Sequence, residues 1–149
     1  MKLLKYFWSG SFSAFAKPFK DNEALYKQAR SFWNTLESFS WMLPIIFLAV
    51  GILVAVYYYT IYNNKPGRHY RPAHWWAFLL VTFLIVLVTT LGSEVLIAKP
   101  RLQGAFMLEM RIALANAFYS VIIYLFTSFV WCNSPLPTNA YRYLKMKKS

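Results

Sequence analysis

The stretch that decides the fold is MLPIIFLAVGILVAVYYYTIY, residues 42–62, which contains no Asp, Glu, Lys, Arg or His. Two further stretches share this property: WWAFLLVTFLIVLVTTLGS at 75–93 and IALANAFYSVIIYLFTSFVWC at 112–132. Each approaches the roughly 20 apolar residues that a helix needs to cross a bilayer. Because a spanning segment must satisfy its own backbone hydrogen bonds, and a membrane strand would alternate in polarity, these runs predict α-helices.

The sequence therefore predicts an all-α integral membrane protein with three transmembrane helices, at about 42–62, 75–94 and 112–132. The composition agrees: 58% of the 149 residues are hydrophobic and 14% are charged, against about a quarter charged in soluble domains. We expect one structural unit, divided into a lead (1–40), a transmembrane part (41–132) and a basic tail (133–149). The single cysteine, Cys132, excludes an intrachain disulfide and a cysteine-based metal cluster.

The lead combines aromatic rings with lysines, a mixture suited to the headgroup layer. Its residues Ala14–Ala16 resemble a signal-peptide cleavage site, but Ser9, Gly10 and Ser11 interrupt the apolar region before it, so we expect the segment to stay attached. A helix is expected to follow from Asp21 or Asn22, since both residue types cap helices well.

This helix is predicted to be amphipathic and to precede the three spans. Apolar residues at steps of three and four share one face: Leu25, Ala29, Phe32, Trp33, Leu36 and Phe39. Lys27, Arg30, Asn34 and Glu37 occupy another face. We interpret the apolar face as lying on the bilayer or against a partner subunit, because a three-span protein has little other surface to bury it. The alternative is that it packs on the chain's own loops.

Aromatic rings near the ends of the predicted helices are typical of interfacial anchors. We assign this role to Trp33, Trp41, Tyr57, Tyr58, Tyr59, Trp75, Trp76 and Trp131. Within the first span, Gly51 and Ala55 form a pair of small residues four apart, a spacing that allows another helix to approach closely.

Polar residues form one-sided stripes on the second and third spans. Such a stripe indicates contact with protein or water rather than lipid, because hydroxyl and carboxamide groups need hydrogen-bond partners in hydrocarbon. The candidates for helix packing or for lining a pore are Thr82, Thr89, Thr90, Ser93, Asn116, Ser120 and Thr127. Among them Asn116 needs the most partners, because a carboxamide both donates and accepts.

Glu94 and Arg111 are predicted to lie at a similar depth, because the short connection makes the second and third spans antiparallel. An ion pair between them is our hypothesis, with Lys99, Arg101 and Glu109 as competing partners. We favour structural pairing, or extension of these side chains to the interface, over proton or ion handling.

Cations are spread over every predicted extramembrane segment and give a formal net charge of +11. We expect the following to contact headgroups or a partner: Lys27, Arg30, Arg68, Arg71, Arg142, Lys145, Lys147 and Lys148. No nucleic acid is expected, because the cations form no single basic face. His69 and His74 stand in a loop with no acid or cysteine nearby, so no metal site is predicted.

Cations close to the spans favour a cytoplasmic tail, whereas attraction of the basic lead to an anionic inner leaflet favours the reverse. We expect the tail to be cytoplasmic, and we place the protein in a bacterial inner membrane or an equivalent energy-transducing membrane.

No catalytic arrangement is predicted, since the chain has five acidic residues in all and lacks HExxH and Gly-rich phosphate-binding motifs. We expect no enzyme and no cofactor. The leading hypothesis is a non-enzymatic membrane subunit that oligomerises or anchors a larger complex, with the lipid bilayer, a second copy or other subunits as partners. The alternative is a small homo-oligomeric channel lined by the polar stripes. A transporter is weaker, because no inverted repeat is evident.

Overall fold

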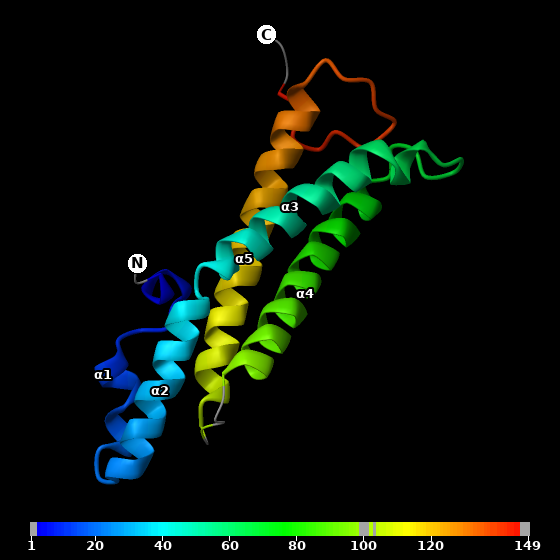
Figure 1. Ribbon diagram of the computed structural model, residues 1–149. Coiled ribbons are helices and arrows are strands. Elements are labelled where there is room, and N and C mark those ends of the chain that lie inside the picture. Colours follow the sequence, from blue (N-terminus) through cyan, green and yellow to red (C-terminus); the bar gives the residue numbers. More distant parts are fainter. Residues whose placement is uncertain (1–2, 99–101, 103, 147–149) are drawn as a thin grey trace. The chain divides into compact units, whose positions relative to one another are not determined.

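The computed structural model describes residues 3–98, 102 and 104–146, and all regular structure in them is helical. Three short helices come first: η1 (Leu4–Phe7), α1 (Phe12–Phe15) and η2 (Lys17–Phe19). The longer helix α2 (Glu23–Phe39) follows. The remaining helices are α3 (Met42–Thr60), η3 (Tyr62–Asn64), α4 (Pro72–Ile97) and α5 (Phe106–Asn133), as Figure 1 shows.

Three segments are long and apolar enough to cross a membrane, which confirms the predicted helical class. They are Met42–Asn64, Pro72–Ile97 and Phe106–Asn133, with mean hydropathies of 2.2, 2.3 and 1.7. At 1.5 Å per residue, α4 and α5 measure about 39 and 42 Å, longer than the roughly 30 Å hydrocarbon core. Both begin before the predicted spans because a helix continues through charged residues, whereas our boundaries followed the uncharged runs.

The chain forms two compact units whose boundaries do not follow the predicted lead, transmembrane part and tail. Unit 1 contains Met1–Ile46 and Leu87–Asn116, and unit 2 contains Phe47–Val86 and Ala117–Ser149. Each long apolar helix therefore contributes one part to each unit.

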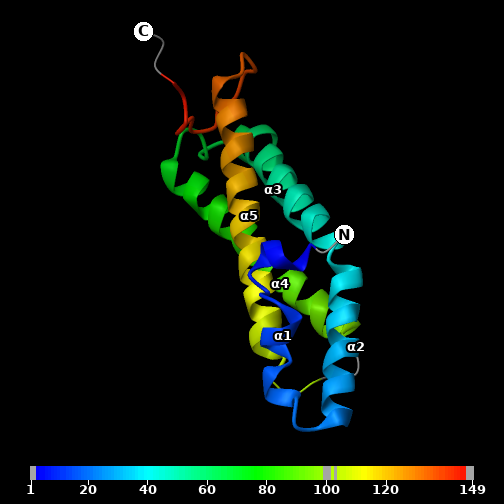
Figure 2. The same cartoon turned by 90° about the vertical axis from the view of Figure 1, so that its left-hand side faces the viewer.

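In unit 1 the lead folds against α2. The Asn22 side chain caps this helix, with Oδ1 accepting hydrogen bonds from the backbone N–H groups of Ala24 and Leu25 at 3.0 and 3.2 Å. This cap satisfies two of the N–H groups that a helix start leaves without partners. Figures 1 and 2 both show α1 beside α2.

The apolar face of α2 is covered by rings of the lead. Its buried residues are Ala29, Phe32, Trp33, Leu36 and Phe39. The Phe15 ring lies 6.0 Å from Phe32 and 5.6 Å from Trp33, centroid to centroid, and Phe12 lies 5.9 Å from Trp33. This face thus packs on the chain's own lead, as in the alternative interpretation, and its contact with a bilayer stays a prediction.

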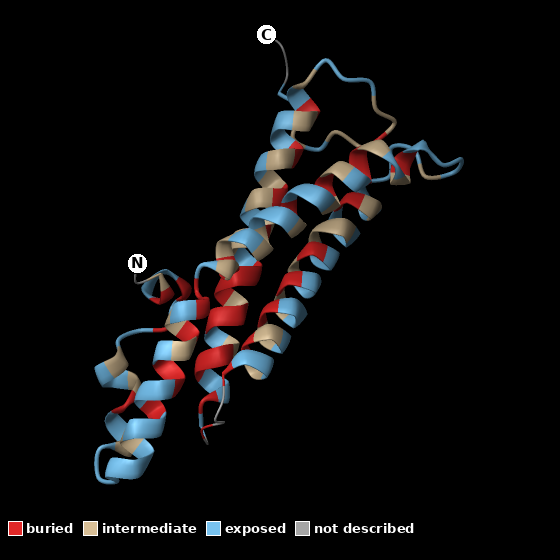
Figure 3. Cartoon of the chain, viewed as in Figure 1, coloured by how far each residue is buried: buried red, intermediate tan, exposed pale blue. Residues whose placement is uncertain are grey.

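The long helices expose many large apolar residues, and Figure 3 colours exposed positions along these helices pale blue. Leu53 on α3, Val88 on α4 and Phe126 on α5 are 66%, 69% and 65% exposed. A water-soluble protein rarely exposes so many large apolar side chains, whereas lipid tails accommodate them.

Candidate helix-packing site

Four residues of the predicted polar stripes are fully buried. Thr82 and Thr90 on α4, and Asn116 and Ser120 on α5, are each 0% exposed. The remaining stripe residues have surface: Thr89 is exposed, and Ser93 and Thr127 are half-buried.

Asn116 and Thr90 join the two helices within unit 1. The Asn116 Nδ2 group donates a hydrogen bond of 2.7 Å to Thr90 Oγ1. Asn116 Oδ1 is buried and has no hydrogen-bond partner among the described residues. The Asn116 carboxamide can make four hydrogen bonds, so this one bond satisfies only part of it.

Glu94 follows Thr90 by one turn and is 1% exposed. Its Oε2 atom has no hydrogen-bond partner in the described part of the chain. Glu109, two turns before Asn116, is also buried and is near enough to Glu94 for their charges to interact. Unit 1 thus concentrates two carboxyl groups and a carboxamide on the facing sides of α4 and α5.

The predicted ion pair between Glu94 and Arg111 is wrong. Within the described ranges, the ion pair that forms is Lys27–Glu23, at 2.7 Å on the surface of α2. Arg111 is exposed whereas Glu94 is 1% exposed, and no ion pair joins the two side chains. The competing partners Lys99 and Arg101 lie outside the described residues.

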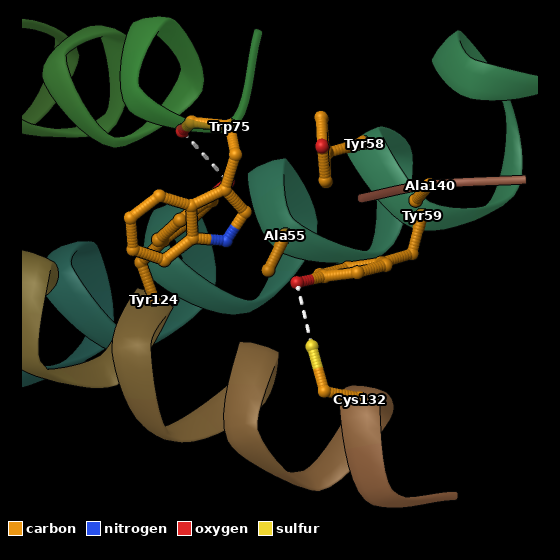
Figure 4. Packing of buried hydrophobic residues seen from close by; sticks show 7 residues of the cluster. All are labelled: Ala55, Tyr58, Tyr59, Trp75, Tyr124, Cys132 and Ala140. Carbon is orange, nitrogen blue, oxygen red and sulfur yellow. Dashed lines mark hydrogen bonds between the residues drawn. The ribbon is translucent and has the colours of Figure 1, made fainter. Parts of the chain in front are cut away.

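Unit 2 has an aromatic interior at the junction of α3, α4, α5 and the tail (Figure 4). Its members are all at most 1% exposed: Ala55, Tyr58, Tyr59, Trp75, Tyr124, Cys132 and Ala140. The Tyr59 hydroxyl lies 3.3 Å from the Cys132 Sγ atom, and the Tyr124 hydroxyl donates to the Trp75 carbonyl at 3.4 Å.

The tail closes one side of this interior. Thr138 Oγ1 donates to the Tyr59 carbonyl at 3.0 Å, and the Tyr70 N–H donates to the Asn139 carbonyl at 3.0 Å. These bonds attach the tail to α3 and to the connection between α3 and α4. The predicted basic tail is thus an ordered part of unit 2 as far as residue 146.

The anchor prediction must be corrected for four of its residues. Tyr58, Tyr59 and Trp75 are at most 1% exposed and Trp33 is 8% exposed, so these rings have almost no surface for headgroups. Successive helix residues point about 100° apart, so three adjacent tyrosines cannot all face outward. The anchor role stays a prediction for the rings that keep surface, which are Trp41, Tyr57, Trp76 and Trp131.

Gly51 lies at a close contact between α3 and α5 in unit 2. A Cβ atom at this position would lie 2.8 Å from Ile123 Cγ2 and 3.0 Å from the Ser120 carbonyl oxygen. Ala55, its predicted small partner, is fully buried. The small residues therefore mark a real contact between helices.

Sequence reasoning missed two polar residues of α5. Ser128 and Cys132 are each 0% exposed and continue the four-residue step that begins at Asn116, Ser120 and Tyr124. The step was visible in the sequence. Tyr124, Ser128 and Cys132 therefore extend the buried stripe to the end of α5.

The predicted cationic contacts are distributed over both units. Lys27, Arg30, Arg71 and Lys145 are exposed. Arg68 lies over the Tyr62 ring at 4.4 Å, and Arg142 donates from Nη2 to the Leu136 carbonyl at 2.7 Å. Lys147 and Lys148 lie outside the described residues.

In the described ranges, no three His, Cys, Asp or Glu side chains are grouped as a metal site requires. The His74 ring instead makes an edge contact with Tyr62, at 5.2 Å between centroids. No protein-family model, curated protein or solved structure matches this chain.

Proposed function

We propose that this protein is a non-enzymatic membrane subunit that anchors a larger membrane-associated complex. One observation carries the proposal: Thr82, Thr90, Asn116 and Ser120 are fully buried within a single chain. Asn116 and Thr90 bond between two helices, whereas Thr82 and Ser120 bond to carbonyl groups of their own helices. All four polar groups are thus satisfied or covered inside one protomer, which leaves the outer faces to lipid. The segment before α3 is then the part best suited to meet a partner.

The outward face of α2 is the surface that fits this role. Its apolar side is buried, whereas Lys27, Gln28, Arg30, Ser31 and Asn34 are exposed. A folded polar helix held at a membrane by three apolar helices is the arrangement that a docking subunit needs. Lys27 already pairs with Glu23, whereas Arg30 pairs with no carboxylate in the described part of the chain. Arg30 is therefore expected to meet an acidic group of the partner.

The same burial argues against a pore lined by the polar stripes. A shared channel in a homo-oligomer needs its lining residues on an outer face of each protomer, where they can meet water. Asn116 and Ser120, the strongest lining candidates, are covered by the chain's own helices.

The test is purification of the full chain from native membranes, with a photo-crosslinker placed at Asn34. We expect a specific protein to crosslink from this position and to be lost on Arg30→Glu. Arg71→Glu is the matched control, since Arg71 is equally a cation on the surface but belongs to the connection between α3 and α4.

Two outcomes contradict the proposal. One is a homogeneous homo-oligomer in which the crosslinker at Asn34 captures no other protein, even without the Arg30→Glu substitution. The other is ion flux in reconstituted vesicles that is abolished by Asn116→Leu while assembly is unchanged, which would establish the channel instead.

A further inference from the structure

The end of α5 and the tail line a half-open cavity of about 450 Å³ in unit 2. Its lining includes Asn133, Pro135, Arg142, Lys145 and Met146. The volume lies in the range of small-molecule sites but is too small for a whole phospholipid. It can therefore hold a headgroup and the part of a lipid nearest to it.

Asn133 holds the wall of this cavity in place. Its Nδ2 group donates to the carbonyl of Phe129 at 2.8 Å and to that of Leu144 at 3.1 Å. Its Oδ1 atom accepts from the Met146 N–H at 2.9 Å. The Asn133 side chain thus links the last turn of α5 to the tail more than ten residues later. Residues 133–146 therefore form a closed loop.

This loop, residues 133–146, places the cations Arg142 and Lys145 at the cavity. The Arg142 guanidinium is fixed by its bond to the Leu136 carbonyl, which uses one of the five N–H groups that such a side chain carries. Lys145 is exposed. No carboxylate pairs with either side chain among the residues that the structure describes. Two cations at a cavity, without an acidic partner, favour an anionic ligand.

The position of the cavity identifies the kind of anion. The third membrane-length helix ends at Asn133, so the cavity lies at one end of a predicted span. Leu136 and Met146 beside it are 49% and 61% exposed. Cations next to exposed apolar side chains match a ligand with a charged head and an apolar body.

We propose that this cavity binds the phosphate group of an anionic phospholipid, with Arg142 and Lys145 as its ligands and Asn133 as the positioning residue. The carboxyl end of a helix disfavours an anion, because its carbonyl groups point outward. Here the Asn133 amide already occupies the Phe129 carbonyl, and the two cations supply a larger opposing charge. This inference does not depend on the proposed docking partner.

The experiment titrates phosphatidylglycerol or phosphatidylcholine into the detergent-solubilised full chain and counts bound lipids by native mass spectrometry. We expect phosphatidylglycerol to bind preferentially, and Arg142→Gln with Lys145→Gln to weaken it at least tenfold. Lys65→Gln with Arg71→Gln removes the same charge from the connection between α3 and α4, and is expected to change binding less than twofold. Asn133→Ala is expected to weaken binding without any change in charge.

Lys145→Gln alone keeps the test valid if the double variant does not fold, because its side chain is exposed. An equal loss in the two double variants would overturn the proposal, since it would show attraction to dispersed charge rather than to a built site. Inorganic phosphate or a phosphopeptide that binds as tightly as phosphatidylglycerol would also overturn it, by showing that the apolar part of the lipid contributes nothing.

Discussion

Unit 1 and unit 2 are built from parts of the same three long helices but differ in one feature of their interiors. Both bury aromatic rings, among them Phe32 in unit 1 and Trp75 in unit 2, but of the described residues only Glu94 and Glu109, both in unit 1, are buried carboxyl groups. In the described part of unit 2 no charged side chain is buried.

Buried rings and buried carboxyl groups affect the free energy of unfolding in opposite ways. Large buried rings contribute apolar contact and tolerate little change, because a truncated ring leaves a cavity. A buried carboxyl group with an unpartnered oxygen lowers stability instead. Truncating a buried ring of unit 2 is therefore expected to lower the free energy of unfolding. Replacing a buried carboxyl group of unit 1 is expected to raise it.

The largest expected effect is in unit 2. Trp75→Ala should lower the free energy of unfolding by about 3–5 kcal/mol, as is usual for removal of a buried aromatic side chain. The neighbouring Trp76 is 52% exposed and is the matched control; its replacement by Ala should cost about 1 kcal/mol or less. Thermal unfolding in detergent measures both, and equal losses would show that Trp75 is not part of a packed interior.

A second prediction concerns the closest helix contact of unit 2. Gly51→Ala should cost about 1–3 kcal/mol, because the added methyl group would press on Ile123 and on the Ser120 carbonyl. Gly92→Ala is the control, since a Cβ atom there meets nothing within 4 Å. That change should raise stability by about 0.5–1 kcal/mol through better helix propensity. The contact would be refuted if both substitutions stabilised the protein.

The third prediction has the opposite sign and concerns unit 1. Glu94→Met should raise the free energy of unfolding by about 1–3 kcal/mol, because it replaces a buried carboxyl group, whose Oε2 atom lacks a partner among the described residues, by an apolar side chain of similar size. Glu23→Gln on the surface of α2 should stay within about 0.5 kcal/mol. A loss of stability in the Glu94 variant would mean that this carboxyl group has a partner that stabilises it.

The smallest expected effect is the coupling between Asn116 and Thr90. A double-mutant cycle of Asn116→Ala and Thr90→Val should give about 0.6 kcal/mol, the average for hydrogen bonds between membrane helices. Thr82→Val is the control, because Thr82 Oγ1 donates to the Phe78 carbonyl of its own helix at 2.8 Å. The changes in the free energy of unfolding caused by Thr82→Val and by Asn116→Ala should therefore be additive. Equal coupling energies in the two cycles would show that Thr90 has no specific interaction with Asn116.

The sequence predicted several elements because their signals are local. The uncharged runs required α-helices, and the Gly51 and Ala55 spacing marked a helix contact. The Asn22 cap and the two faces of α2 also followed from short-range pattern. The stripe at Thr82, Thr90, Asn116 and Ser120 was recognised as polar and one-sided, yet the pattern alone did not say whether these residues face a lumen or a neighbouring helix.

The remaining features depend on which segments meet in space. Tyr57, Tyr58 and Tyr59 are alike in sequence, but only Tyr57 keeps substantial surface, because α4, α5 and the tail cover the other two. The failed pairing of Glu94 with Arg111 has the same origin, since equal depth does not fix which way a side chain turns around a helix.

The sequence by itself determined that this is a helical protein with three membrane-length helices, because hydropathy and helix capping act within a few turns of the chain. Only the tertiary structure decided what covers α2, which rings are buried and that Asn133 closes residues 133–146 into a loop. Those outcomes depend on contacts between residues far apart in the chain, and no local pattern encodes them.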